Sequence, residues 1–190
     1  MNATEEKIEK SSHTACIVLR IARVCVWVLA AALLFIALVS GIIYLGLGGE
    51  EFMNAMDGGE MVSDLAGVTG SYSADTVIKL LIVATFSAVV YLGLLLGLLY
   101  TAGAFFSATR KALTPFLVEN AERIRIMAVL ILLASVVPTL MDAVSSLIIG
   151  LKPDLFTFSL EGLILSIILF CVGVLFEHGC HLQQEADETL

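Results

Sequence analysis

The stretch that decides the fold is residues 80–109, which read LLIVATFSAVVYLGLLLGLLYTAGAFFSAT and contain no charged side chain. A helix needs about 20 apolar residues to cross ~30 Å of hydrocarbon, and this stretch exceeds that length. Continuous apolar runs lack the alternation of barrel strands, so helices are expected. The sequence therefore predicts an all-α integral membrane four-helix bundle, a single domain over residues 1–190. The predicted spans are about 21–48, 76–109, 115–151 and 154–177.

Composition supports the membrane class and excludes others. Of 190 residues, 59% are hydrophobic and 15% are charged, which is too apolar for a soluble domain of this size. The net charge of -8 argues against direct nucleic-acid binding, which needs a basic face. The sequence contains no Gly-rich phosphate loop, no HExxH and no nucleophile motif. We therefore expect a non-enzyme without a cofactor, whose main partner is the lipid bilayer.

Basic residues are distributed unevenly about the spans. Eight lie before the first span or between the second and third, and two lie on the other side. The positive-inside rule then predicts that both termini, the connector 110–125 and the tail 178–190 are cytoplasmic. The loop 49–75, with six acids and no basic residue, would lie outside. The eight are Lys7, Lys10, Arg20, Arg23, Arg110, Lys111, Arg123 and Arg125, and the two are Lys79 and Lys152.

Two acids fall inside the predicted third and fourth spans. Asp142 and Glu161 lie at similar distances from the turn that joins these spans, so they can face each other, and Lys79 could reach the same level. Charges at this depth require partners or protonation. The three residues form either a proton- or cation-coupled site or a structural polar network that reaches interfacial water. Their expected hydroxyl neighbours are Thr139, Ser145 and Ser146.

Three further patterns carry local predictions. Thr114 and Pro115 are expected to be the N-cap and first residue of the third helix. Gly93 and Gly97 form a small-xxx-small motif, which suits packing within the chain or a homo-oligomer. A set of histidines and cysteines shares the cytoplasmic end and has residue types that suit zinc, but its spacings match no zinc pattern, so we expect no metal. The set is His13, Cys16, His178, Cys180 and His181.

Two stretches carry a family resemblance: residues 113–127, LTPFLVENAERIRIM, and residues 176–190, FEHGCHLQQEADETL. With the four-span plan, they resemble the YoaS-like bacterial membrane proteins, a family of unknown function. That family has a Pro-Phe-Thr-x-x-Asn-x-x-Arg-Leu-Arg-like segment and a Phe-x-x-Gly-x-x-Leu-Gln-x-Glu-x-Asp-x-Thr-Val-like tail. This chain departs from the pattern at Leu117 and Leu190. The matching positions are Pro115, Phe116, Asn120, Arg123 and Arg125, then Phe176, Gly179, Leu182, Gln183, Glu185, Asp187 and Thr189.

The resemblance implies a location and a partner. It places the chain in the bacterial cytoplasmic (inner) membrane, and members of this family are often encoded beside a small Cro/CI-type helix-turn-helix regulator. We expect a non-catalytic protein that senses a membrane or envelope signal and binds or sequesters that regulator. The arginines at 123 and 125 could pair with the acids at 185, 187 and 188 and fold the tail under the bundle. The alternatives are a small ion- or proton-coupled transporter component and an envelope immunity protein.

Overall fold

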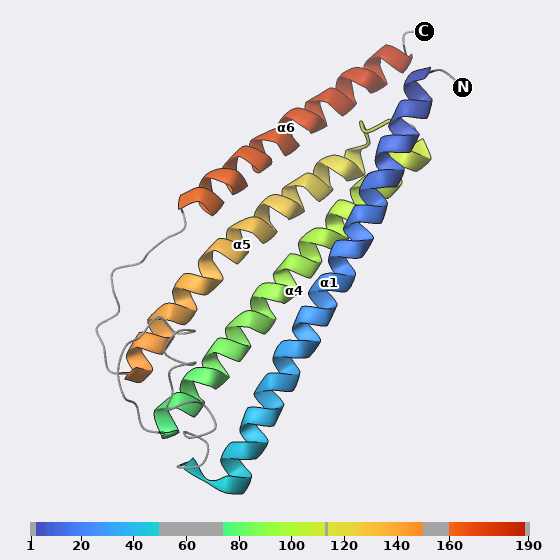
Figure 1. Ribbon diagram of the computed structural model, residues 1–190. Helices are drawn as coiled ribbons and strands as arrows, with labels where there is room; N and C mark the ends of the chain where they lie inside the picture. Colours follow the sequence, from blue (N-terminus) through green and yellow to red (C-terminus); the bar gives the residue numbers. More distant parts are fainter. Residues whose placement is uncertain (1–2, 50–73, 113, 150–159, 189–190) are drawn as a thin grey trace. The chain divides into compact units, whose positions relative to one another are not determined.

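The computed structural model describes residues 3–49, 74–112, 114–149 and 160–188, and within these ranges the chain is all-helical. Each of its four helices is long and apolar enough to cross a membrane (Figure 1). The predicted all-α class with four candidate spans is therefore confirmed. The helices are α1 (Ala3–Leu47), α4 (Ala74–Ala112), α5 (Val118–Ile149) and α6 (Leu160–Glu188). The predicted outer loop falls almost entirely outside the described residues, as does the predicted turn around 150–154.

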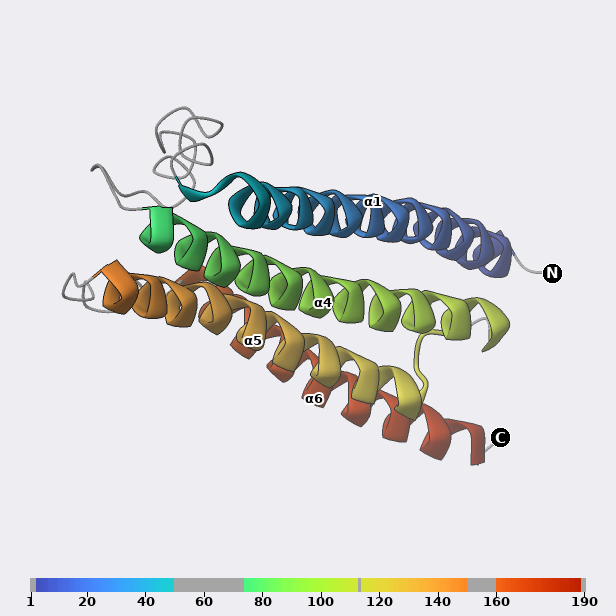
Figure 2. The same ribbon diagram turned by 90° about the horizontal axis from the view of Figure 1, so that it is seen from below.

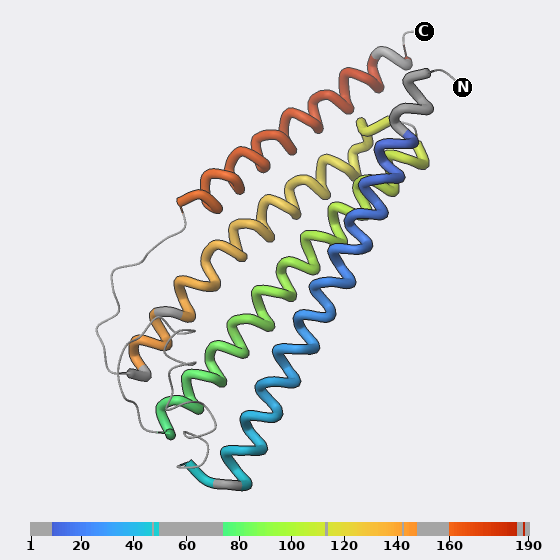
Figure 3. The backbone as a smooth tube through the Cα atoms, viewed as in Figure 1, coloured from blue at the N-terminus to red at the C-terminus, as the bar shows by residue number. Residues whose placement is uncertain are grey.

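The helices are longer than their apolar runs. Helix α1 has 45 residues, which rise about 68 Å, more than twice the ~30 Å of a hydrocarbon core. Helix α6 continues to Glu188, so residues 178–188 of the predicted tail extend the fourth helix. Figure 3 traces the coloured parts of α1 and α6 as unbroken helices. Hydropathy therefore marks where a helix can be in lipid and leaves open where the helix ends.

The chain divides into two compact units, which are described separately. Unit 1 comprises Met1–Trp27, Gly93–Val136 and Ser159–Leu190, and it holds segments of all four helices. The Ser12 hydroxyl donates to the Phe106 carbonyl at 2.5 Å, which joins α1 to α4. In the same unit α5 and α6 lie side by side (Figure 2), and the Ser166 hydroxyl of α6 donates to the Ala128 carbonyl of α5 at 2.9 Å.

Unit 2 comprises Val28–Leu92 and Val137–Phe158. Here the Tyr44 hydroxyl of α1 donates to the Asp75 carboxylate of α4 at 2.5 Å. An apolar groove of about 580 Å³ lies between the same two helices. Because both helices are candidate membrane spans, lipid chains are sufficient to fill such a groove.

Helix α5 begins at Val118, three residues later than the sequence predicts. The Leu117 carbonyl accepts the N–H of Ala121 at 3.2 Å, which makes Leu117 the N-cap in place of Thr114. The reason lies at Pro115, whose carbonyl accepts the Asn120 side-chain amide at 3.0 Å. The Leu117 N–H donates to the same carbonyl at 2.9 Å, so the Pro115 carbonyl is part of a turn and not of the α5 hydrogen-bond ladder.

Candidate functional site

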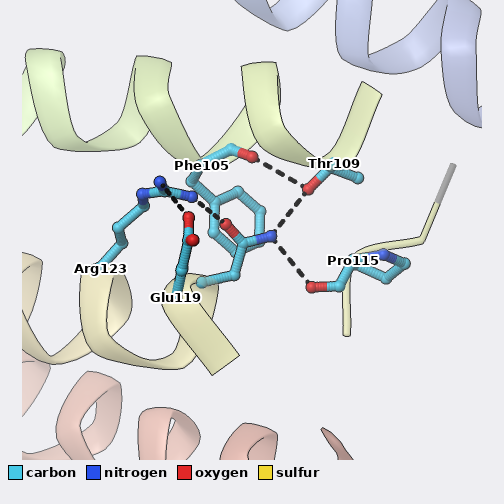
Figure 4. A network of polar contacts seen from close by, with 6 residues as sticks. Phe105, Thr109, Pro115, Glu119 and Arg123 are labelled. Atoms are coloured by element: carbon cyan, nitrogen blue, oxygen red, sulfur yellow. Dashed lines mark hydrogen bonds and ion pairs between the residues drawn. The ribbon is translucent and has the colours of Figure 1, made fainter. Parts of the chain in front are cut away.

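Asn120 is the centre of a polar network in unit 1 (Figure 4). Its side chain is 0% exposed. The amide nitrogen donates to the Thr109 hydroxyl at 3.2 Å and to the Pro115 carbonyl at 3.0 Å, while the amide oxygen accepts from Arg123 Nη1 at 2.7 Å. A single buried amide therefore joins the end of α4, the following turn and the first turns of α5.

Each partner of Asn120 has a second partner of its own. The Thr109 hydroxyl donates to the Phe105 carbonyl at 3.0 Å, and Arg123 Nη2 forms an ion pair with Glu119 at 2.9 Å (Figure 4). Buried polar networks stabilise a fold when all their members are satisfied, and this one meets that condition. The network fixes the shape of the α4–α5 connection.

The two stretches singled out in the sequence pack against each other. The Phe116 and Phe176 rings are stacked, with centroids 5.0 Å apart and planes inclined by 23°. Gly179 lies beneath Phe116, because a Cβ atom added at Gly179 would be 3.1 Å from the Phe116 ring. The Phe105 ring of α4 approaches Phe176 at 6.1 Å. The aromatic cluster therefore joins α4, the turn and α6.

Arg125 links α5 to α6 next to the aromatic cluster. Its guanidinium forms an ion pair with Glu177, and its Nε is buried without a hydrogen-bond partner. Gly173 allows the close approach, since a Cβ atom there would be 3.0 Å from Arg125 Cγ and 3.3 Å from Ile124 Cγ2. A Cβ atom at this position would require the arginine stem to move by a few tenths of an ångström.

The structure gives both arginines partners other than the tail acids that the sequence suggested. Arg123 pairs with Glu119, one turn earlier on its own helix, and Arg125 pairs with Glu177. The described part of the tail continues as helix α6 to Glu188. Of the remaining motif positions, Leu182 is 67% exposed, Gln183 is half-buried and Glu185 is exposed, and the side chains of Asp187 and Thr189 lie outside the described residues.

The predicted intramembrane site stays a prediction. Lys79 is an exposed residue of α4 in unit 2, and Glu161 is exposed in the first turn of α6 in unit 1. The helix dipole favours a carboxylate in that first turn. Glu161 lies sixteen residues, or about 24 Å of helix, before Glu177, so it is far from the Arg125–Glu177 ion pair. The side chain of Asp142 lies outside those that the structure describes.

The histidine and cysteine set does not come together as a metal site in the described ranges. Among these residues no group of three or more His, Cys, Asp or Glu side chains is placed to hold an ion. Cys180 is buried and Cys16 is half-buried, while the three histidines are exposed.

Sequence reasoning missed several residues that build this site. Thr109 closes the polar network, Gly173 admits Arg125, and Glu177 supplies the interhelical carboxylate. Arg23, used only to orient the chain, lies with its guanidinium carbon 4.7 Å from the Tyr100 ring centroid. The available signals were a polar residue at the end of an apolar run, as at Thr109, and a glycine within such a run, as at Gly173. Neither signal tells which residue the side chain or the backbone contacts.

Comparisons with protein-family models, with curated proteins and with solved structures find no match to this chain. The likeness to the YoaS-like proteins accordingly depends on the two quoted stretches alone. The candidate site is defined by geometry: two stretches about sixty residues apart in sequence meet at one end of unit 1.

Proposed function

We propose that this chain is a non-catalytic, multi-pass membrane protein that binds a soluble protein where the two motif stretches meet. The observation that carries the proposal is the stack of Phe116 on Phe176 over Gly179, fixed by the Asn120 network. Docking on a surface already held in its bound shape costs less ordering entropy than docking on a loose one.

An exposed apolar patch adjoins this stack. Phe116 is 44% exposed and Leu182 is 67% exposed. Leu182 follows Gly179 by three residues, so it lies on the face of α6 that Phe116 covers. Phe116 precedes Arg125 and Leu182 follows Glu177, so both lie outside the charge-free runs of α5 and α6. Apolar side chains exposed to water rather than to lipid are suited to a protein partner.

The sequence supports a proposal for the partner and for its side of the membrane. The excess of basic residues at this end favours the cytoplasm, and the family resemblance favours the bacterial inner membrane. The same resemblance suggests a small helix-turn-helix regulator as the bound protein. A membrane or envelope signal would act by shifting the population of states in which the patch is presented.

Site-specific photocrosslinking tests the proposal in cells. A photoreactive amino acid replaces Leu182, and as a matched control it replaces Val18, a similarly exposed apolar residue of α1 in unit 1. We expect a covalent adduct with one soluble protein from position 182 and none from position 18. Mass spectrometry of the adduct should identify a helix-turn-helix protein. Equal labelling at both positions, or adducts with lipid alone, would contradict the docking surface, whereas a soluble partner of another type would contradict only the regulator assignment.

A further inference from the structure

The Arg23 side chain is held in place by contacts with α1 and α4 of unit 1. Its guanidinium carbon lies 4.7 Å from the Tyr100 ring centroid, and its Nε donates to the Leu19 carbonyl at 3.3 Å. On α4 the guanidinium passes Gly103, where an added Cβ atom would be 3.5 Å from Nη2. A cation–π contact and a backbone hydrogen bond therefore orient the charged group.

Arg23 differs from the half-buried Arg123 and Arg125 in its counter-charge. Arg123 pairs with Glu119 and Arg125 pairs with Glu177. Among the side chains that the structure describes, no carboxylate lies within ion-pair distance of Arg23, and its Nη groups have no acceptor there. Because a guanidinium stays charged in proteins, a half-buried one that lacks a carboxylate has donors free to bind an anion from outside the chain.

Two helices independently place this group at the edge of the hydrocarbon. Arg23 is the last charged residue before the charge-free run that begins at Val24. On α4, Tyr100 lies twenty residues beyond Leu80, the start of that helix's charge-free run. Twenty helical residues rise about 30 Å, the thickness of the hydrocarbon core. Counted from Leu80 as the other edge, this places the guanidinium near the headgroups of one leaflet.

We propose that Arg23 and Tyr100 form a binding site for the phosphate of an anionic phospholipid headgroup. The planar guanidinium, stacked on the ring, presents its Nη donors to the phosphate oxygens in the fork geometry that suits phosphate. The Tyr100 hydroxyl, on an exposed side chain, supplies a further donor. Gly103 lies beside the guanidinium on the α4 side.

Lipid retention by the full-length protein tests the site. The protein is purified in detergent with an equimolar mixture of phosphatidylglycerol and phosphatidylcholine, and bound lipids are counted by native mass spectrometry. We expect Arg23→Gln to weaken phosphatidylglycerol binding about tenfold, the loss expected for a charge-assisted hydrogen bond. Arg20→Gln, which removes the same charge three residues earlier on α1, is expected to weaken it less than twofold. Tyr100→Phe keeps the ring and removes the hydroxyl, so an intermediate loss is expected.

Further arms distinguish a phospholipid site from a general charge effect and from a free-anion site. Arg23→Lys keeps the charge but lacks the planar pair of guanidinium donors. This variant should fold as the parent does and still bind phosphatidylglycerol several-fold more weakly. Inorganic phosphate added at millimolar concentration should not displace the lipid, and full displacement would assign the site to a free anion. Equal losses in Arg20→Gln and Arg23→Gln, or equal retention of the two lipids by the parent, would overturn the proposal. None of these outcomes depends on the soluble partner.

Discussion

Replacing Asn120 with alanine is the sharpest test of the polar network. The change removes two hydrogen bonds to neutral groups, Thr109 and Pro115, and one from the charged Arg123. Neutral bonds contribute about 1 kcal/mol each, and a bond to a charged group contributes about 2 kcal/mol. The three partners keep their other bonds, to Phe105, Leu117 and Glu119, so no orphaned group adds a further penalty. The free energy of unfolding should therefore fall by about 4 kcal/mol.

The measurement is unfolding in mixed micelles by titration with dodecyl sulfate, followed by circular dichroism. Asn120→Asp has the same shape but places an oxygen against the Pro115 carbonyl, so it should destabilise the protein despite its attraction to Arg123. The matched control is Ser135→Ala on the same helix, whose hydroxyl bonds only the Ile131 carbonyl one turn away. We expect a change within about 0.5 kcal/mol there. The reasoning is refuted if Asn120→Ala is no less stable than Ser135→Ala.

Two further stability predictions use the same titration. Gly173→Ala should lower the free energy of unfolding by about 1 kcal/mol, because its Cβ atom meets Arg125. Gly41→Ala, whose Cβ atom has nothing within 4 Å, should raise it by about 0.5 kcal/mol through helix propensity. Similar effects at both glycines would argue against tight α5–α6 packing. A double-mutant cycle of Arg125→Leu and Glu177→Leu should give a favourable coupling of about 1 kcal/mol, kept modest because each side chain is 36% exposed. A coupling of zero would mean that the ion pair does not help to hold α6.

The four helices were predictable, and their ends were not. Long runs without charge can only be helices in lipid, which is why all four appear where hydropathy places them. The bilayer rule, however, sets a boundary near residue 21 for the first span, while α1 begins at Ala3. Residues 3–20 contain no Gly or Pro, so nothing in them stops a helix from continuing into water.

The candidate site was predictable in its location but not in its contacts. Positive-inside reasoning placed both motif stretches on one membrane face, and the structure brings them together. The pairing of Phe116 with Phe176 depends on a register between helices sixty residues apart, which a single sequence does not encode locally. The start of α5 was misplaced for a related reason, because a buried Asn120 amide takes the Pro115 carbonyl that a longer helix would have used.

The way α5 and α6 are held suggests how a membrane signal could reach the docking patch. Between helices in lipid no hydrophobic effect operates, so small residues and polar bonds set the register. Here Arg125 with Glu177 and Ser166 with the Ala128 carbonyl fix it at two heights. Sliding α6 by one turn, about 5.4 Å, would break both and carry Gly179 away from Phe116. The proposed docking patch thus depends on the register between α5 and α6. A signal that favours one register by about 1.4 kcal/mol would change partner binding at most tenfold.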